Sequence, residues 1–161
     1  MRTSTLVLVS VVLLVCVALA PSGALARMAP DKVNVFDGFF VPAQGTPAAF
    51  KDIHLISVAN PAHNNSADRT APYPYGWIEL KGARQPRFPL LKPTLESKNL
   101  SFKTRVVRGI SYEFSGTLPK IEYESLDEIN SAPVLTGTLR KLQAGKVIAE
   151  GKVAFGWFAG D

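Results

Sequence analysis

Four side chains capable of metal or acid–base chemistry lie in one short stretch of the sequence: Asp52, His54, His63 and Asp68. Imidazole and carboxylate groups can bind a divalent cation, or act as a base and the group that orients it. However, the spacing of the two histidines matches no compact metal-ligand motif, and Asp52 and His54 fit the polar face of one strand. The sequence therefore favours ordinary surface residues and predicts no catalytic residue, no metal site and no cofactor.

A second candidate site is the segment 59–76, which has no clear helix or strand pattern and is longer than most connections in compact domains. Aromatic rings close the segment, and amide, carboxylate and guanidinium groups precede them. Such groups are the components of sugar and peptide subsites. We therefore expect ligand-binding residues here, namely Tyr73, Tyr75, Trp77, Asn65, Asp68 and Arg69. The alternative is a loop whose aromatic side chains fold back over the core.

Basic residues surround Phe88 in the segment 81–93, which three prolines hold extended. The four cations are Lys81, Arg84, Arg87 and Lys92. Such a cluster would suit an acidic polymer or a lipid headgroup. The sequence favours a simpler interpretation, a solvated connection between strands.

Two hairpins are the clearest elements that could position these segments. Residues 100–107 alternate apolar and charged side chains with period two, Arg108-Gly109 forms a turn, and the alternation resumes over 110–115. The apolar face comprises Leu100, Phe102, Thr104, Val106, Ile110, Tyr112 and Phe114. A second hairpin joins 134–142 to 146–158, where Val147, Ala149, Gly151, Val153, Phe155 and Trp157 share one face. Gly137 and Gly151 predict bends or close backbone approach within these strands.

Further strands are expected at 33–40, 53–58 and 75–81, and one short helix at 125–130 with Ser125 as its N-cap. Short strands joined by turns, without βαβ alternation, indicate an all-β domain. We expect an antiparallel up-and-down barrel or a curved β-sandwich of about seven strands with at most one short helix. The consecutive order of the last four strands favours the barrel.

Residues 1–26 have the features of a secretory signal peptide: Arg2, an apolar run over 6–20, and Ala24-Leu25-Ala26 before the expected cut. The run is shorter than the roughly twenty residues that a spanning helix needs. We therefore expect a single exported β-rich domain over 27–161, periplasmic or extracellular, without a transmembrane segment. The only cysteine, Cys16, lies in the leader, so the mature chain has no thiol chemistry or disulfides.

Charge and motifs narrow the classes of function. The formal net charge of +5 becomes +4 without Arg2, too small an excess to predict a nucleic-acid partner. The sequence has no GxSxG, HExxH, GxGxxG, P-loop or EF-hand signature. We therefore expect a non-enzymatic domain that binds a small molecule, a glycan or an envelope protein. The alternatives are an envelope assembly component that presents a strand edge, and a hydrolase that gathers His54 and His63 from distant strands.

Overall fold

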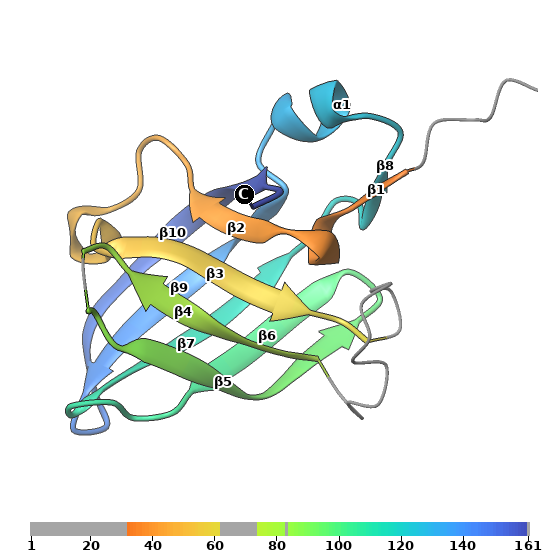
Figure 1. The fold of residues 1–161 in the computed structure, drawn as a ribbon. Helices are drawn as coiled ribbons and strands as arrows, with labels where there is room; N and C mark the ends of the chain where they lie inside the picture. Colours follow the sequence, from red (N-terminus) through yellow and green to blue (C-terminus); the bar gives the residue numbers. More distant parts are fainter. Residues whose placement is uncertain (1–31, 62–73, 83, 161) are drawn as a thin grey trace, which may run out of the picture.

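Eight antiparallel strands close into one barrel in the computed structural model, which describes residues 32–61, 74–82 and 84–160 (Figure 1). In their order around the barrel, the strands are β10 (Lys146–Phe158), β2 (Phe39–Pro42), β3 (Ile53–Ala59), β4 (Tyr75–Leu80), β5 (Arg87–Glu96), β6 (Asn99–Thr104), β7 (Ile110–Thr117) and β9 (Leu135–Gln143). Because barrel strands that are consecutive in the chain are also neighbours in the sheet, the topology is up-and-down. The all-β prediction is confirmed, and the barrel is chosen over the sandwich.

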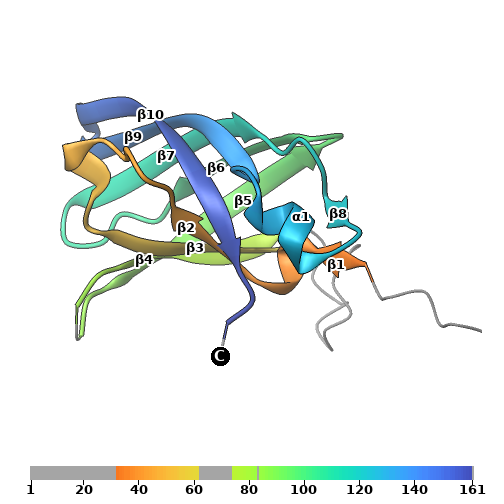
Figure 2. The ribbon, with the colours of Figure 1, turned by 90° about the horizontal axis from the view of Figure 1, so that it is seen from above.

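Four of the remaining elements cover one end of the barrel. They are β1 (Val33–Asn34), which pairs with β8 (Glu122–Tyr123), the 3-10 helix η1 (Val35–Asp37) and the helix α1 (Leu126–Asn130). Together they lie over this end, which we call the capped end (Figures 1 and 2). The two helices bury their apolar side chains, which are Val35 and Phe36 of η1 and Ile129 of α1. The indole N–H of Trp157 donates a hydrogen bond to the Val35 carbonyl at 3.1 Å.

The opposite end, which we call the loop end, carries the turns β2–β3, β4–β5, β6–β7 and β9–β10 (Figure 2). The first of these turns contains the 3-10 helix η2 (Ala48–Phe50). None of the helices in the described ranges has the length and hydropathy that a bilayer crossing requires.

Large apolar side chains fill the barrel interior. The Phe114 ring stacks on Phe102 with centroids 5.2 Å apart and meets Phe155 edge-on at 6.1 Å. The core expected from the two hairpins is confirmed: Leu100, Phe102, Tyr112, Phe114, Leu139, Val153 and Phe155 belong to one cluster, with Ile110 packed against it. This packing fixes the inner face of each strand, and therefore also the outer face.

The β6–β7 hairpin has the predicted turn at Arg108-Gly109, but the strand that precedes it ends earlier than predicted. β6 ends at Thr104, and the hairpin closes through the Val107–Ile110 bridge with Arg108 at φ 52° and Gly109 at φ 79°. Two positive φ values in a two-residue turn match the twist of paired strands. Because the alternation breaks after Thr104, Val106 does not join the core as predicted and is 67% exposed.

A β-bulge corrects the prediction for the last strand. The register between β9 and β10 shifts between Val147 and Ala149, so the extra residue, Ile148, reverses the faces that precede it. Val147 is consequently 51% exposed and does not share the inner face with Val153. Gly151 confirms the expected close approach, because a Cβ there would lie 3.2 Å from the Pro47 ring.

Two further segments differ from expectation. The segment 81–93 is not a solvated connection, because most of it belongs to β5, where Pro93 is buried at a register shift between Leu91 and Thr94. Bulges tolerate proline because they leave a ladder position unpaired. The strand expected at 33–40 is split by η1, where the Asn34 side chain accepts a hydrogen bond from the Phe36 amide. The other expected elements, including the Ser125-capped helix, are present.

Candidate functional site

The aromatic segment proposed from the sequence is only partly described. His63, Asn65, Asp68, Arg69 and Tyr73 lie outside the described residues. Tyr75 and Trp77 lie on β4, where they alternate with the fully buried Ile78 and therefore point to the outer face of the barrel. Neither side chain lines the interior.

The Trp77 side chain is held by its neighbours on the barrel wall. Its indole N–H donates to the Glu79 carboxylate at 3.4 Å, and the Arg87 guanidinium lies 4.7 Å from the ring centroid. Arg87 also forms an ion pair with Glu79 at 2.9 Å. The Arg87 guanidinium covers one face of the indole. This face of Trp77 is therefore used for a contact within the barrel wall.

The histidine and carboxylate candidates do not converge where they are described. His54 is exposed on β3, whereas the Asp52 carboxylate turns toward Lys141 and pairs with its ammonium group at 3.2 Å. Among the residues in the described ranges, no group of three or more metal-ligating side chains occurs. The described Asp52 carboxylate therefore takes part in an ion pair with Lys141.

The basic segment around Phe88 is also dispersed. Phe88 is buried inside the barrel and meets the Tyr112 ring edge-on at 5.1 Å. Lys81 and Arg84 lie in the β4–β5 turn at the loop end, and Lys92 lies at the bulge of β5. These cations therefore do not form one patch around an exposed aromatic ring.

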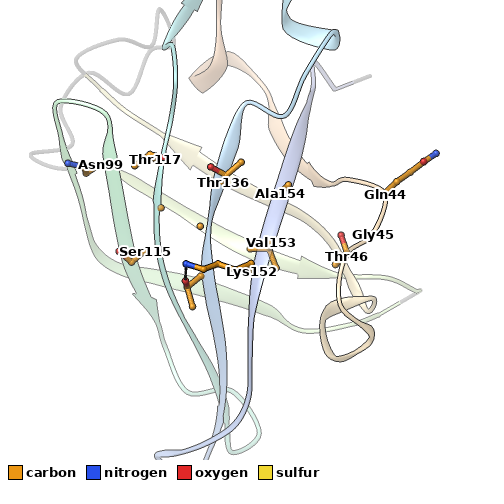
Figure 3. Close-up of a pocket in the computed structure, with 13 residues that line it drawn as sticks. Gln44, Gly45, Thr46, Asn99, Ser115, Thr117, Thr136, Lys152, Val153 and Ala154 are labelled. Atoms are coloured by element: carbon orange, nitrogen blue, oxygen red, sulfur yellow. Dashed lines mark hydrogen bonds between the residues drawn. The ribbon is translucent and has the colours of Figure 1, made fainter.

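The structure instead offers a polar hollow on the outer wall, of about 720 Å³ (Figure 3). Strands β6, β7, β9 and β10 form its floor, and the β2–β3 turn forms one side. The Ala43 amide ties this turn to the Ala154 carbonyl at 2.9 Å. The polar lining consists of Gln44, Thr46, Asn99, Ser115, Thr117, Thr136, Thr138 and Lys152. This lining contains hydroxyls, amides and one cation, but no carboxylate.

Strand register arranges these side chains in two rows across the wall. One row runs Ser101, Ser115, Thr138, Lys152, and the other runs Asn99, Thr117, Thr136, Ala154. Between them lies the backbone of the paired glycines Gly116 and Gly137. Side chains directly opposite on neighbouring strands are about 5 Å apart, so the rows form a regular array of hydrogen-bonding groups.

A second hollow of about 520 Å³ continues the first and shares Ser115 and Thr138 with it. Its lining includes the ion pairs Lys103–Glu113, at 2.8 Å, and Arg140–Glu150. Within the described chain, Lys92 and Lys152 line these hollows without an ion pair to a carboxylate. Lys152 donates to the Thr138 hydroxyl at 3.0 Å. The two hollows therefore form one strip, and each part contains one lysine that has no carboxylate partner in the described chain.

A separate polar cluster closes the core near the loop end. Lys141 is 22% exposed, pairs with Asp52, and lies 5.8 Å from the centroid of the Tyr112 ring. The Tyr112 hydroxyl and one Asp52 oxygen are buried without a hydrogen-bond partner among the described residues. Burial, and secondarily the negative charge of Asp52, raises the pKa of the Tyr112 phenol. The phenol therefore keeps its proton to a higher pH than an exposed tyrosine does.

Comparison with known proteins adds no relative, since no family model, curated protein or solved structure gives a significant match to this chain. The hydroxyl rows were missed in the sequence although their signal was present. Ser115 and Thr117, and Thr136 and Thr138, occupy alternate positions of two strands. These residues form rows only because their strands are neighbours in a particular register. The alternation of side chains along one strand does not predict which strands are neighbours or what their register is.

Proposed function

We propose that this protein is an exported, non-enzymatic binding domain whose ligand is an acidic oligosaccharide. The observation that carries the proposal is the pair of hydroxyl and amide rows across β6, β7, β9 and β10, beside two cations without carboxylate partners in the described chain. Sugar hydroxyls both donate and accept hydrogen bonds, as do Ser, Thr, Asn and Gln side chains. A sugar carboxylate would be the natural partner of Lys152 or Lys92.

The shape of the strip supports an oligomer rather than a single sugar. The two hollows adjoin through Ser115 and Thr138, so a chain of sugar units can extend over both. The described lining offers no exposed aromatic ring, so binding would depend on hydrogen bonds and charge. Such contacts are wet and individually modest, and several units would be needed for useful affinity.

The barrel gives less support to the other classes of function. Each barrel strand has a neighbour on both sides, so assembly by strand addition would be limited to the stretch of β10 that precedes Ala154, which β2 does not pair. The described His and carboxylate groups do not converge into a hydrolytic site. The outer strip, in contrast, brings hydroxyl, amide and ammonium groups together on one surface of the described barrel.

The test is a calorimetric titration with tetragalacturonate as the acidic probe and maltotetraose as the neutral one. We expect the acidic probe to bind more tightly. Replacing Thr117 and Thr136 by Val removes two exposed hydroxyls but keeps β-branched residues, and should weaken binding about 10-fold to 30-fold. Lys152→Gln should weaken the acidic probe alone.

The matched control removes an outer hydroxyl that does not line either described hollow, in Ser111→Ala. This control should retain the parent affinity. If neither probe binds, or if the control loses as much affinity as the Thr117→Val, Thr136→Val protein, the strip is not the binding site.

A further inference from the structure

The turns at the loop end of the barrel lie opposite the capped end (Figure 2), and six cationic residues lie in or next to these turns. They are Lys51, Lys81, Arg84, Arg105, Arg108 and Lys146, and all are exposed. They come from four different turns, β2–β3, β4–β5, β6–β7 and β9–β10. The up-and-down topology brings these turns together, so a set dispersed over the sequence becomes one basic surface.

This charge has no internal compensation in the described part of the chain. None of the six cations forms an ion pair there, whereas Arg87, Lys103, Arg140 and Lys141 on the wall and inner face each pair with a carboxylate. The four turns contain one carboxylate, Asp52, which pairs with Lys141. The loop end therefore carries a positive potential toward solvent.

Exposed aliphatic side chains stand among these cations. Val106 is 67% exposed, Val147 51% and Ile148 52%. The two turns that carry them are held side by side, because Ile110 pairs with Gln143 and the Ala144 amide donates to the Gly109 carbonyl at 3.0 Å. Such exposure of large apolar side chains in one place is a mark of an interaction surface.

Among the residues that the structure describes, the opposite end has the reverse charge. Its carboxylates are Asp37, Glu96, Glu122, Glu124, Asp127 and Glu128, against the cations Lys32, Lys98 and Lys120. A negatively charged surface would therefore attract the loop end and repel the capped end. The charge distribution gives the molecule a preferred orientation toward such a surface.

We propose that the loop end docks on an anionic lipid bilayer, with the six cations at the headgroups and Val106, Val147 and Ile148 in the interfacial region. A soluble polyanion would satisfy the cations but would leave the aliphatic side chains in water. A bilayer accepts both, because cations bind its anionic surface while apolar side chains enter the headgroup–acyl boundary. This proposal uses a different surface from the saccharide strip and is independent of it.

The test uses protein purified after export and processing, because an attached apolar leader would itself bind lipid. Co-sedimentation compares vesicles of phosphatidylcholine alone with vesicles that contain one part phosphatidylglycerol to three parts phosphatidylcholine. We expect binding to the anionic vesicles only, with a partition coefficient that falls as salt is added. Absence of binding to the anionic vesicles would overturn the proposal.

Two variants separate the contributions. Replacing Arg105, Arg108 and Lys146 by Gln should lower the partition coefficient about 100-fold, since each cation near an anionic surface contributes roughly fivefold. Replacing Val106, Val147 and Ile148 by Ser should lower it at least 10-fold at unchanged net charge. Thermal unfolding checks that both variants keep the fold.

The matched control removes three cations from the capped end, in Lys32→Gln, Lys98→Gln and Lys120→Gln, and should bind vesicles at least as well as the parent. An equal loss in this control would mean that only net charge matters, which overturns the docking geometry. If the serine variant binds vesicles normally and the parent binds heparin equally well, the partner is a soluble polyanion rather than a bilayer.

Discussion

Tyr112 places a polar group inside an otherwise apolar barrel. Its side chain is completely buried, with Phe88 edge-on to the ring and Lys141 near its face. The backbone amide of Tyr112 donates to the Thr104 hydroxyl at 2.9 Å, but the phenol hydroxyl has no partner among the described residues. A buried hydroxyl without a hydrogen bond costs free energy of folding, while the aromatic ring contributes through packing.

We therefore predict that Tyr112→Phe does not destabilise the protein. The substitution keeps the ring and its contacts and removes only the unpaired hydroxyl. The free energy of unfolding at pH 7, measured by urea denaturation, should stay constant or rise by about 1 kcal/mol. A loss of more than about 1 kcal/mol would show that the hydroxyl is hydrogen-bonded in solution.

Tyr112→Phe should also change how the free energy of unfolding depends on pH in the alkaline range. The pKa of Tyr112 is higher in the folded protein than its ordinary value of about 10, so above this pH the unfolded chain loses a proton that the folded chain retains. The contribution of Tyr112 is complete below pH 10 and is lost as pH rises toward the folded pKa. Stability should fall with pH above 10 and fall less steeply in Tyr112→Phe. An identical slope in both proteins would contradict the burial of this phenol.

At the scale of the elements, the close approach of the paired strands β7 and β9 depends on two glycines that lie opposite each other. Gly116 lies opposite Gly137, and the Phe114 ring occupies the space beside both. A Cβ on Gly137 would lie 2.4 Å from the Ser115 carbonyl oxygen and 2.7 Å from the end of the Phe114 ring. The strands approach closely here because neither position has a side chain.

We predict that Gly137→Ala lowers the free energy of unfolding by about 2 to 3 kcal/mol, as overpacking in a core does. The matched control is Gly156→Ala in β10, where the nearest atom to the new Cβ is the Val41 methyl at 3.9 Å. The control should lie within about 0.5 kcal/mol of the parent, or above it. Urea denaturation of both proteins measures the difference, and equal stabilities would disprove the close approach at Gly137.

The strands could be predicted wherever period two was uninterrupted, as from Leu100 to Phe102 and from Tyr112 to Phe114. Prediction failed where an irregular residue changed the face or ended the pairing. Val106 and Val147 were misassigned because the end of β6 and the bulge at Ile148 leave no mark in an apolar–polar pattern. β5 was missed because Pro93 suggests a loop, although a bulge accommodates it.

The candidate site was less accessible to sequence reasoning than the fold. Its groups are ordinary Ser and Thr residues on the outer faces of β6, β7 and β9, and what distinguishes them is their lateral order. This order follows from long-range register, such as Thr117 opposite Thr136. The sequence suggested aromatic residues such as Trp77 because of their residue type. In the structure, the Arg87 guanidinium covers one face of the Trp77 ring as part of the barrel wall.

At the scale of the whole molecule, the two proposed binding sites lie on different sides of one barrel. The basic turns face along the barrel axis at the loop end, whereas the hydroxyl strip lies on the side wall over β6, β7, β9 and β10 (Figures 1 and 3). A barrel docked by its loop end would leave the capped end farthest from the lipid and the strip facing sideways. The β2–β3 turn borders both surfaces, since Gln44 and Thr46 line the strip and Lys51 belongs to the basic surface of the loop end, but the other residues of the two surfaces differ.

The saccharide proposal places the protein outside the cytoplasm, and the last prediction tests this directly. The apolar run over 6–20 is followed by Pro21 and Gly23, and Ala24-Leu25-Ala26 offers the small residues that a signal peptidase accepts. The first described strand, Val33–Asn34, pairs with β8, and Lys32 pairs with Glu124 at 3.2 Å. A cut before Arg27 would therefore leave the capped end of the barrel intact.

We predict that intact-mass measurement of the exported protein gives a chain that begins at Arg27 and stays in solution without detergent. Replacing Ala24 and Ala26 by Phe should block processing, because the peptidase accepts only small side chains at these two positions. A second small-residue motif, Ala18-Leu19-Ala20, lies upstream, but Pro21 would directly follow a cut there. The control Ala18→Leu alters this motif and should leave the mass of the product unchanged. A mass that retains residues 1–26, or that carries a lipid on Cys16, would show that the leader remains as an anchor. Lipid binding would then belong to the leader rather than to the loop end.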